Sequence, residues 1–434
     1  VLKKAGFKKG QRIAVLLPNS PQVLALSLAA WSLGGAISPL NAKSGLPSLM
    51  GTLNLVEPCA VVLAPGLDEL KEALREQQVP VVLAESLSTP LPSFSVRETS
   101  VEDESLAVIF ATSGTTGLPK AVPLTHGNLL DNALRMYDSL ELLAEGDNLL
   151  NVLPNFHSFG YTVAIWTVLM LDPKCVYHYS PLEARPIGKL SRDHGVTILV
   201  ATPTFLRSYI RRCDPGDFAK TEVVITGAEK LPREVAEAFH AKFGVLPVEG
   251  YGTTELSPVV STNIPDTRLV SDFQQGNRIG SVGQPLPGIS AKVVDLETGE
   301  SLGTGKSGML LVKGPNVMKG YLGQAELTAQ VVRDGWYTTG DIAKIDEDGF
   351  LYITGRQSRF SKIAGEMVPH LRVEEALSEV LGDDGEGEQR AVVMGVPDEK
   401  KGERLVVLHT NLDLAPDQIC RRLTEAGVPP LWIP

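Results

Sequence analysis

The chain has 434 residues, a length that allows two or three domains of ordinary size and a large buried core. Hydrophobic residues make up 43% and charged residues 21%, which is typical of a globular protein. The net charge of −11 argues against a nucleic-acid-binding protein that relies on general basicity. The four cysteines lie far apart with no C-x-x-C pair, so we expect a reducing compartment and neither a zinc site nor a disulfide framework.

The first long apolar stretch, residues 13–42, carries no charge and approaches the roughly 20 apolar residues that a membrane span needs. Prolines at 18, 21 and 39 and the glycine pair at 34 and 35 interrupt it. The segment IAVLLPNSP at its start has the pattern of a strand followed by a helix start. We therefore predict a helix buried against a sheet rather than a membrane span.

Further along the first half, short apolar runs alternate with amphipathic segments. The runs are RIAVLLP, AVVLAP, VPVVLAE, AVIFAT, NLLNVLP, VTILVATP and EVVITGAE, a pattern typical of buried parallel strands. Helical patterns lie between several of them, including residues 126–140 and 232–244. This alternation predicts a layered α/β domain.

After about residue 280 the pattern changes to alternating polar and apolar residues with turn dipeptides such as Thr298-Gly299 and Asp348-Gly349. Antiparallel hairpins have this pattern. We predict an α/β fold with a large domain over residues 1–355, including a β-rich subdomain at about 280–355. A small α/β domain over residues 356–434 follows, and its core needs more elements than this stretch supplies.

The segment ATSGTTGLPK, residues 111–120, follows the strand-like run Leu106–Phe110 and offers hydroxyls, bare backbone N–H groups and one ammonium. Such a loop has the chemistry of a phosphate-binding site. The Walker pattern does not fit, because Pro119 follows Gly114 by five residues and Lys120 begins a second apolar stretch. The loop is therefore expected to join two strands.

A second segment, EGYGTTELSP at residues 249–258, combines an aromatic ring, two hydroxyls and a carboxylate. Tyr251 could stack on a base, Thr253 and Thr254 could bind phosphate oxygens, and Glu255 could hold a hard cation. An ordinary Gly-rich turn would have the same composition. The segment alone does not decide between these two interpretations.

A third candidate lies in YTTGD, residues 337–341, where we predict Asp341 at the start of a strand after a tight turn. A carboxylate there could accept both hydroxyls of a ribose. Arg356, after LYITG, offers a planar fork for phosphate or ribose oxygens. The simpler alternatives are that Asp341 caps a turn and that Arg356 forms a surface ion pair.

The order of these segments is far more specific than any one of them. TSGTTGLPKAV, PNFHSFG, TGAEKLP, GYGTTE, WYTTGD and GFLYITGR, followed by KIAGE, resemble the motifs of the adenylate-forming, AMP-binding superfamily over nearly the whole chain. The resemblance implies an acid–thiol ligase that uses ATP and Mg²⁺ to form an acyl adenylate. It also implies that the large domain binds ATP and the acyl group and that the small C-terminal domain is mobile.

The resemblance assigns roles to residues. The implied ATP-binding residues are Thr112, Ser113, Gly114, Thr115, Thr116, Gly117, Lys120, Gly227, Ala228, Glu229, Tyr251, Gly252, Thr253, Thr254, Asp341 and Arg356. The implied catalytic residues are Lys120, Thr254, Glu255 and Arg356, with Glu255 as the magnesium ligand. His157 and Gly250 match the substrate side, and Ser358 stands at the hinge where the family usually has an acidic residue or lysine. The family's adenylation lysine is expected beyond Pro434, and no residue of this chain matches it.

One stretch, KIAGEMVPHLRVEEAL, resembles the acyl-acyl carrier protein synthetase domains that accompany lysophospholipid acyltransferases. This branch predicts transfer of a fatty acid to the phosphopantetheine of acyl carrier protein, in the cytoplasm or at the inner face of a membrane beside an acyltransferase. The alternative is a fatty-acid or aryl-acid CoA ligase. An acidic carrier protein would need a basic surface, for which Arg356, Arg359, Lys362 and Arg372 are candidates, although a solvated linker has the same composition.

Two other classes stay open at this stage. His126 and Asp131 fit H-x-x-x-x-D, a signature of glycerolipid acyltransferases, but Thr125 before them has the character of a helix N-cap. The chain could also be a nucleotide-binding module without catalysis. Dependence of the reaction on ATP distinguishes a ligase from a simple acyltransferase.

Overall fold

The computed structural model describes residues 2–3, 5–87, 101–113, 119–138, 146–171, 173–265, 268, 276–364, 366–381, 390–398, 400–410 and 414–434. The chain forms two compact units. The first consists of Val1–Ala291, Leu311–Thr339 and Asp346–Tyr352, and the second of Lys292–Leu310, Gly340–Ile345 and Ile353–Pro434.

The first sheet of the first unit has the strand order β4-β3-β1-β2-β5-β6. Its elements are β1 (Arg12–Leu16), α1 (Pro21–Ser32), β2 (Ala36–Pro39), α2 (Leu46–Val56), β3 (Ala60–Leu63), α3 (Asp68–Glu76), β4 (Val81–Leu83), β5 (Leu106–Ser113) and β6 (Pro119–Thr125). The strands β1 to β4 pair in parallel, and β5 and β6 are antiparallel. Parallel strands are buried on both faces, which is why their sequences are continuously apolar.

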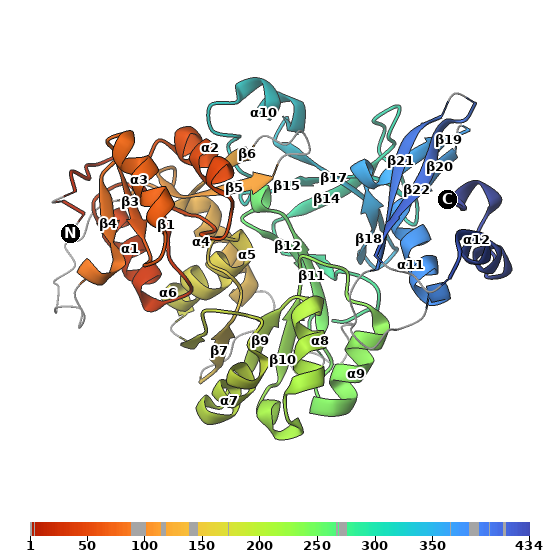
Figure 1. The fold of residues 1–434 in the computed structure, drawn as a ribbon, viewed down its shortest axis with the longest axis horizontal. Coiled ribbons are helices and arrows are strands. Elements are labelled where there is room, and N and C mark those ends of the chain that lie inside the picture. Colours follow the sequence, from red (N-terminus) through yellow and green to blue (C-terminus); the bar gives the residue numbers. More distant parts are fainter. Residues whose placement is uncertain are drawn as a thin grey trace. The chain divides into compact units, whose positions relative to one another are not determined.

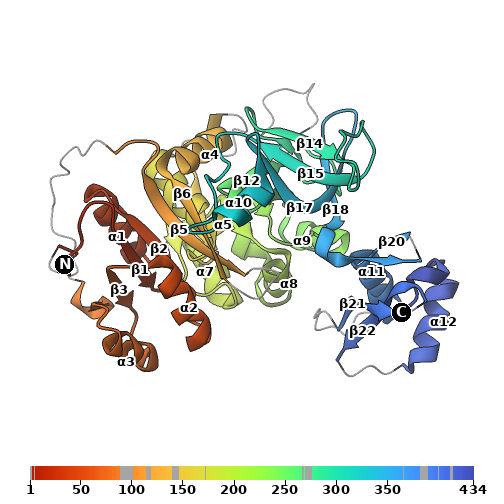
Figure 2. The same ribbon diagram turned by 90° about the horizontal axis from the view of Figure 1, so that it is seen from above.

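Helices cover both faces of this sheet, with α1 on the side opposite α2 and α3 (Figure 2). The prediction of a buried helix in the uncharged stretch is confirmed: Val23, Leu26, Ala30 and Trp31 of α1 are all buried. Pro21 starts this helix, where its missing N–H costs no hydrogen bond. In the described part of the chain, no helix is long and apolar enough to cross a membrane.

The second sheet has the strand order β13-β12-β11-β10-β9-β7-β8. Its strands are β7 (Asn148–Asn151), β8 (Lys174–Tyr177), β9 (Ile198–Ala201), β10 (Val223–Thr226), β11 (Val248–Gly252), β12 (Val259–Thr262) and β13 (Gln284–Pro285). The helices around it are α4 (His126–Asp138), α5 (Ser158–Tyr161), α6 (Thr167–Leu171), α7 (Ala184–His194), α8 (Pro203–Arg212) and α9 (Arg233–Phe243). A π-helical turn, Thr162–Trp166, joins α5 to α6.

The core of this layer lies between α7, α8 and α9 and one face of the second sheet (Figure 1). Leu206 and Tyr209 of α8 and Phe239 of α9 are fully buried there against Leu199 of β9. Helix α9 ends at Phe243 and is followed by Gly244, which adopts the left-handed φ of +82° that is common after a helix and that glycine takes without strain. This layer positions the carboxyl ends of β10 and β11, from which the predicted site residues extend.

The remaining elements belong to the last third of the chain. They are β14 (Ser290–Val294), β15 (Gly308–Lys313), α10 (Ala325–Val331), β16 (Val332–Arg333), β17 (Trp336–Ile345), β18 (Leu351–Arg356), β19 (Phe360–Ile363), β20 (Glu366–Pro369), α11 (His370–Leu381), β21 (Ala391–Asp398), β22 (Gly402–His409) and α12 (Pro416–Glu425). Strands β14, β15, β17, β16 and β18 form one sheet, and β20-β19-β22-β21 form another. The second of these sheets packs α11 and α12 around Val373, Leu377 and Leu423.

Candidate active site

The hairpin of β5 and β6 carries the first predicted motif. Thr112 and Lys120 face each other across the two strands, so the prediction of a loop between two strands is confirmed. The predicted phosphate-binding residues Gly114, Thr115, Thr116 and Gly117 lie outside the described residues, as does the side chain of Ser113. Thr112 and Lys120 are therefore the members of the motif that the structure places.

The segment Gly227–Glu229 follows β10 and lies beside the end of β11, because Thr226 pairs with Glu249. Ala228 adopts φ +68°, an unusual conformation for a residue with a side chain. The Glu229 carboxylate accepts hydrogen bonds from the backbone N–H and the hydroxyl of Thr204, the latter at 2.7 Å. These contacts hold the segment against the start of α8.

Tyr251 and Gly252 end β11, and Thr254 and Glu255 lie in the short 3₁₀ turn, Thr254–Leu256, that follows before β12. A Cβ on Gly252 would lie 1.9 Å from the carbonyl oxygen of Pro258, so only glycine fits. The Thr254 hydroxyl lies 3.1 Å from the hydroxyl of Ser158, which starts α5. The turn therefore presents Tyr251 and Glu255 from a backbone that is fixed on both sides.

Glu255 meets Lys120 through a tyrosine that the sequence motifs did not include. The hydroxyl of Tyr321 donates a hydrogen bond to Glu255 Oε1 at 2.8 Å, and Lys120 Nζ lies 5.1 Å from the centre of the Tyr321 ring. Tyr337 is buried next to this pair, and burial, followed by the charge of Glu255, raises the pKa of its hydroxyl. The first unit thus gathers a cation, a carboxylate and two phenols from four separate segments.

The predicted substrate-side segment around His157 reaches this turn through Ser158, whose hydroxyl lies 3.1 Å from that of Thr254. His157 precedes α5 with its ring 4.6 Å from the ring of Phe156. Phe159 of α5 faces Gly227, where a Cβ would lie 3.1 Å from the ring. Gly250 is close to Gly227, its carbonyl oxygen 3.6 Å from the same Cβ position. Phe159 therefore joins the predicted adenine-side and substrate-side segments.

Asp341 and Arg356 belong to the second unit, where Arg356 Nε lies 3.3 Å from Asp341 Oδ1. The Asp341 side chain is 11% exposed and that of Arg356 is 60% exposed. The prediction that Asp341 starts a strand is wrong, because β17 runs without a break from Trp336 to Ile345. Gly340 makes this possible, since it takes φ +77° within the strand and a turn is not required.

The four basic residues considered as a carrier-protein surface are each paired with a carboxylate in the second unit. Besides the Arg356 pair, Arg359 contacts Glu374 at 2.5 Å, Lys362 contacts Glu297 at 3.4 Å and Arg372 contacts Glu375 at 3.3 Å. Ser358, the predicted hinge residue, lies in a short 3₁₀ turn between β18 and β19. These four positions do not form a surplus of positive charge.

His126 and Asp131, which fit the H-x-x-x-x-D signature, are not arranged for base catalysis. The His126 ring packs edge-on against Trp31 and Trp166, and burial lowers its pKa to about 4. Asp131 binds Arg135 at 2.7 Å instead of orienting the histidine. The Thr125 hydroxyl accepts the N–H of Asn128, so Thr125 caps α4 as predicted.

The residues around Glu255 fit a magnesium ion that is bound together with phosphates. Within the described ranges, no group of three or more His, Cys, Asp or Glu side chains could form a metal cage. Mg²⁺ commonly keeps several waters and binds through one or two carboxylates plus substrate phosphates. A single carboxylate beside a lysine suits that mode of binding.

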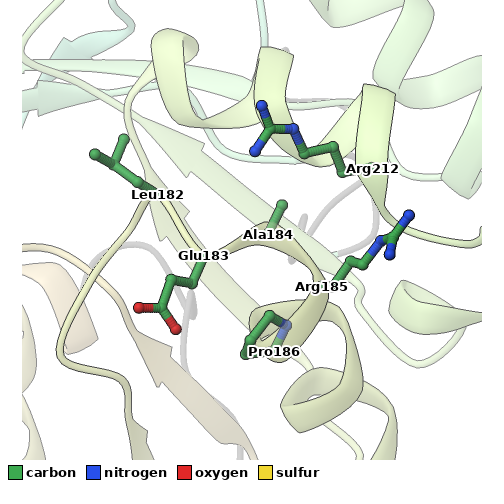
Figure 3. Close-up of a pocket in the computed structure, with 6 residues that line it drawn as sticks. All are labelled: Leu182, Glu183, Ala184, Arg185, Pro186 and Arg212. Carbon is green, nitrogen blue, oxygen red and sulfur yellow. The ribbon is translucent and has the colours of Figure 1, made fainter.

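A separate pocket of about 470 Å³ lies between the start of α7 and the end of α8 (Figure 3). Leu182, Glu183, Ala184, Arg185, Pro186 and Arg212 line it. None of the predicted site residues is among them, and Figure 3 shows side chains directed in several directions rather than towards one point. This pocket is therefore not the site that the sequence motifs predict.

Sequence comparison agrees with the motifs. A sequence model described as AMP-binding enzyme matches residues 1–322. A long-chain-fatty-acid–CoA ligase of Bacillus subtilis is 31% identical over 92% of this chain and 76% of its own length. A feruloyl-CoA synthase of an Amycolatopsis species is 30% identical over 93% of this chain and 79% of its own length.

Solved structures agree as well. ATP-bound MatB from Rhodopseudomonas palustris superposes with a TM-score of 0.82 at 28% identity, covering 100% of this chain and 85% of that one. The o-succinylbenzoate CoA synthetase MenE of Bacillus subtilis, in complex with an acyl-adenylate intermediate, shares the fold with a TM-score of 0.85 at 24% identity and the same coverage. The chain therefore belongs to the AMP-binding enzymes and is an acid–thiol ligase of the acyl-adenylate-forming family.

Proposed function

We propose that the protein uses ATP to activate a fatty or aryl carboxylic acid and transfers the acyl group to coenzyme A. The observation that carries this proposal is the meeting of Lys120 and Glu255 at Tyr321, a cation and a carboxylate that contact the same side chain. The names of the relatives, a fatty-acid CoA ligase and a feruloyl-CoA synthase, support the acid classes and the thiol. The ATP-bound state of MatB supports the nucleotide.

The proposed reaction has two steps. A carboxylate oxygen of the acid attacks the α-phosphorus of ATP, a P–O bond forms, the bond to the β-phosphate breaks and pyrophosphate leaves. The thiol sulfur then attacks the activated carbonyl carbon, the bond to AMP breaks and the thiol proton passes to solvent. Both reactants of the first step are anions, so positive charge and hydrogen-bond donors must offset the negative charge that concentrates there.

The residues of the first unit have separate parts in this proposal. Lys120 would bind the β- and γ-phosphates, and the Thr254 hydroxyl would contact the α-phosphate. Glu255 would hold Mg²⁺, which when bound supplies charge neutralisation for the phosphates. Gly227 to Glu229 and the Tyr251 ring would enclose the adenine, and His157 would lie near the acid.

Asp341 and Arg356 would contribute to ribose binding, and Ser358 to movement between the steps. Asp341 would accept the ribose hydroxyls, and Arg356, already beside it, would bind phosphate or ribose oxygens. A boundary between a large and a small domain near residue 355, with Ser358 as hinge, remains part of this proposal. It is supported by the position of Ser358 in a short turn between two strands.

Coenzyme A is preferred to acyl carrier protein as the acceptor for two reasons. The named relatives act on coenzyme A. The basic residues first considered for carrier-protein docking are already paired with carboxylates, so they offer little attraction to an acidic protein. Carrier protein remains the alternative acceptor.

The test is ATP–pyrophosphate exchange with a panel of fatty and aryl acids, followed by AMP release on adding coenzyme A or acyl carrier protein. Exchange with one acid class and AMP release with coenzyme A would support the proposal. AMP release with carrier protein but not with coenzyme A would show that carrier protein is the acceptor. ATP binding without exchange for any acid would contradict catalysis and favour a nucleotide-binding module.

A further inference from the structure

We infer that Tyr321 is a positioning residue that fixes the orientation of Glu255 and Lys120 and thereby sets the affinity of the site for a divalent cation bound with ATP. This inference rests on the proposed function, because it concerns the same site. Tyr321 touches both ionic groups, although both are distant in the sequence. Lys120 stands 201 positions before it and Glu255 stands 66 positions before it.

The hydrogen bond to Glu255 gives the carboxylate one orientation. Tyr321 donates to Oε1, so Oε2 is left for a cation and its waters. Tyr337 is buried, and this burial, the charge of Glu255 and its interaction with Tyr321 are among the causes that raise the pKa of its hydroxyl. The O–H of Tyr321 has a defined direction, because the carboxylate of Glu255 can only accept a hydrogen bond.

The ring of Tyr321 acts on the lysine. Lys120 Nζ lies 5.1 Å from the ring centre, within the range of a cation–π contact. Among the residues that the structure describes, no carboxylate forms an ion pair with Lys120. The ring therefore restrains the ammonium without neutralising it, which keeps its charge available to a phosphate.

Backbone hydrogen bonds fix the segment that carries Tyr321 at both ends. The N–H of Met318 donates to the carbonyl oxygen of Glu255 at 2.8 Å, and the N–H of Leu322 donates to the carbonyl oxygen of Ala121 at 2.9 Å. The segment is thus attached to Glu255 itself and to the neighbour of Lys120. Tyr321 keeps its position relative to both groups because the backbone does.

The test compares Tyr321→Phe, which removes only the hydroxyl, with the wild type in direct binding of Mn²⁺ in the presence of ATP, followed by electron paramagnetic resonance. We expect the dissociation constant of Mn²⁺ to rise about tenfold, the value of one lost hydrogen bond to a charged group. The Mg²⁺ concentration for half-maximal ATP–pyrophosphate exchange should rise by a similar factor, with the KM of the acid unchanged.

Tyr209→Phe is the matched control. Tyr209 is also buried and donates to a carbonyl oxygen, that of Pro181, at 3.0 Å, and in the described part of the chain its hydrogen bond and ring contact reach no predicted site residue. It should lower stability without changing Mn²⁺ binding. A second variant, Tyr321→Leu, also removes the ring and should weaken the binding of metal-free pyrophosphate, measured by calorimetry, where Tyr321→Phe does not.

Unchanged Mn²⁺ binding in Tyr321→Phe, or an equal change in Tyr209→Phe, would overturn the inference. So would absence of any Mn²⁺ binding with ATP in the wild type. Failure of the proposed function looks different: the wild type would then exchange pyrophosphate with no acid, while the binding measurement, which needs neither acid nor thiol, still tests Tyr321.

Discussion

At the scale of single residues, the Asp341–Arg356 pair is the clearest test of the proposed ribose site. A carboxylate that accepts two ribose hydroxyls makes hydrogen bonds to a charged group, each contributing about 1.5–3 kcal/mol. Asp341→Ala should therefore raise the KM for ATP by about a hundredfold or more in the pyrophosphate-exchange assay.

Asp348→Ala provides the control for this variant. Asp348 also forms an ion pair with an arginine, Arg278, at 2.7 Å, but it is not a predicted site residue. Its replacement should change the KM for ATP by less than about twofold, since exposed ion pairs contribute little. Equal effects of the two variants would remove the ribose assignment.

Glu249 predicts a dependence of stability on pH. Glu249 is 7% exposed, its carboxylate accepts the N–H of Leu231 at 2.8 Å, and burial raises the pKa of its carboxyl from 4.5 to about 7. The folded state therefore holds this proton more tightly than the unfolded state. Below pH 4.5 the carboxyl is protonated in both the folded and the unfolded state, and above pH 7 it is ionised in both. The free energy of unfolding therefore falls as the pH rises from 4.5 to 7.

The comparison is with Glu249→Gln, which keeps the shape and cannot ionise. The free energy of unfolding of the wild type, relative to that of the variant, should fall by about 3 kcal/mol across this pH window. Urea denaturation at several pH values measures it. Parallel curves for the two proteins would mean that Glu249 titrates near its ordinary pKa.

At the scale of elements, the turn between β11 and β12 depends on Gly252. An added Cβ would lie 1.9 Å from the Pro258 carbonyl oxygen, a backbone atom that cannot rotate away. Gly252→Ala should destabilise the first unit by about 2–4 kcal/mol and displace Tyr251 and Thr254, lowering exchange activity. A thermal unfolding curve and the exchange assay measure the two effects.

Gly216→Ala is the matched control, because a Cβ there has no atom within 4 Å. It should change stability by less than about 0.5 kcal/mol and leave exchange unaltered. If Gly252→Ala behaved like Gly216→Ala, the turn would have to be more adaptable than its close contact with Pro258 indicates.

The sequence predicted the local elements well and the assembled site less well. The hairpin of β5 and β6, the buried helix α1 and the helix α9 follow from short-range periodicity and turn residues. The strand around Asp341 was mispredicted, because a glycine with positive φ was interpreted as a turn. The π-helical turn after α5 left no periodic signal at all.

Tyr321 illustrates why the rest could not be predicted. It stands 66 residues after Glu255, between the motifs GYGTTE and WYTTGD, and no spacing rule connects it to either. Ser158 and Phe159 lay within a recognised motif, but their contacts to Thr254 and Gly227 depend on how two strands and a helix meet. Contacts of this kind arise from packing rather than from local pattern.

At the scale of the whole molecule, the second unit depends on one largely buried ion pair. The Glu374 side chain is 6% exposed and accepts hydrogen bonds from Arg359 and from the backbone N–H of Val393. Removing one partner leaves a buried charge uncompensated, which is strongly destabilising. Because the Arg359 side chain is itself 36% exposed, we expect Arg359→Ala to cost roughly 2–3 kcal/mol.

Hydrogen exchange followed by mass spectrometry locates this loss. Peptides from β19 to β22 should exchange faster in Arg359→Ala, while peptides from β9 and β10 in the first unit should not change. Arg372→Ala is the control, since its pair with Glu375 is more exposed and should contribute less than about 0.5 kcal/mol. Faster exchange throughout the chain would mean that the two units unfold as one.

The attachment of residues 318–322 to both Glu255 and Ala121 has a consequence for folding. The proposed cation site brings together segments separated by up to about 200 positions, so forming it costs chain entropy that local structure does not recover. A partly folded chain would contain every sequence motif and still lack the assembled site. Binding of a metal–nucleotide complex there would accordingly report that the first unit has reached its native topology, and would favour that topology over any incomplete one.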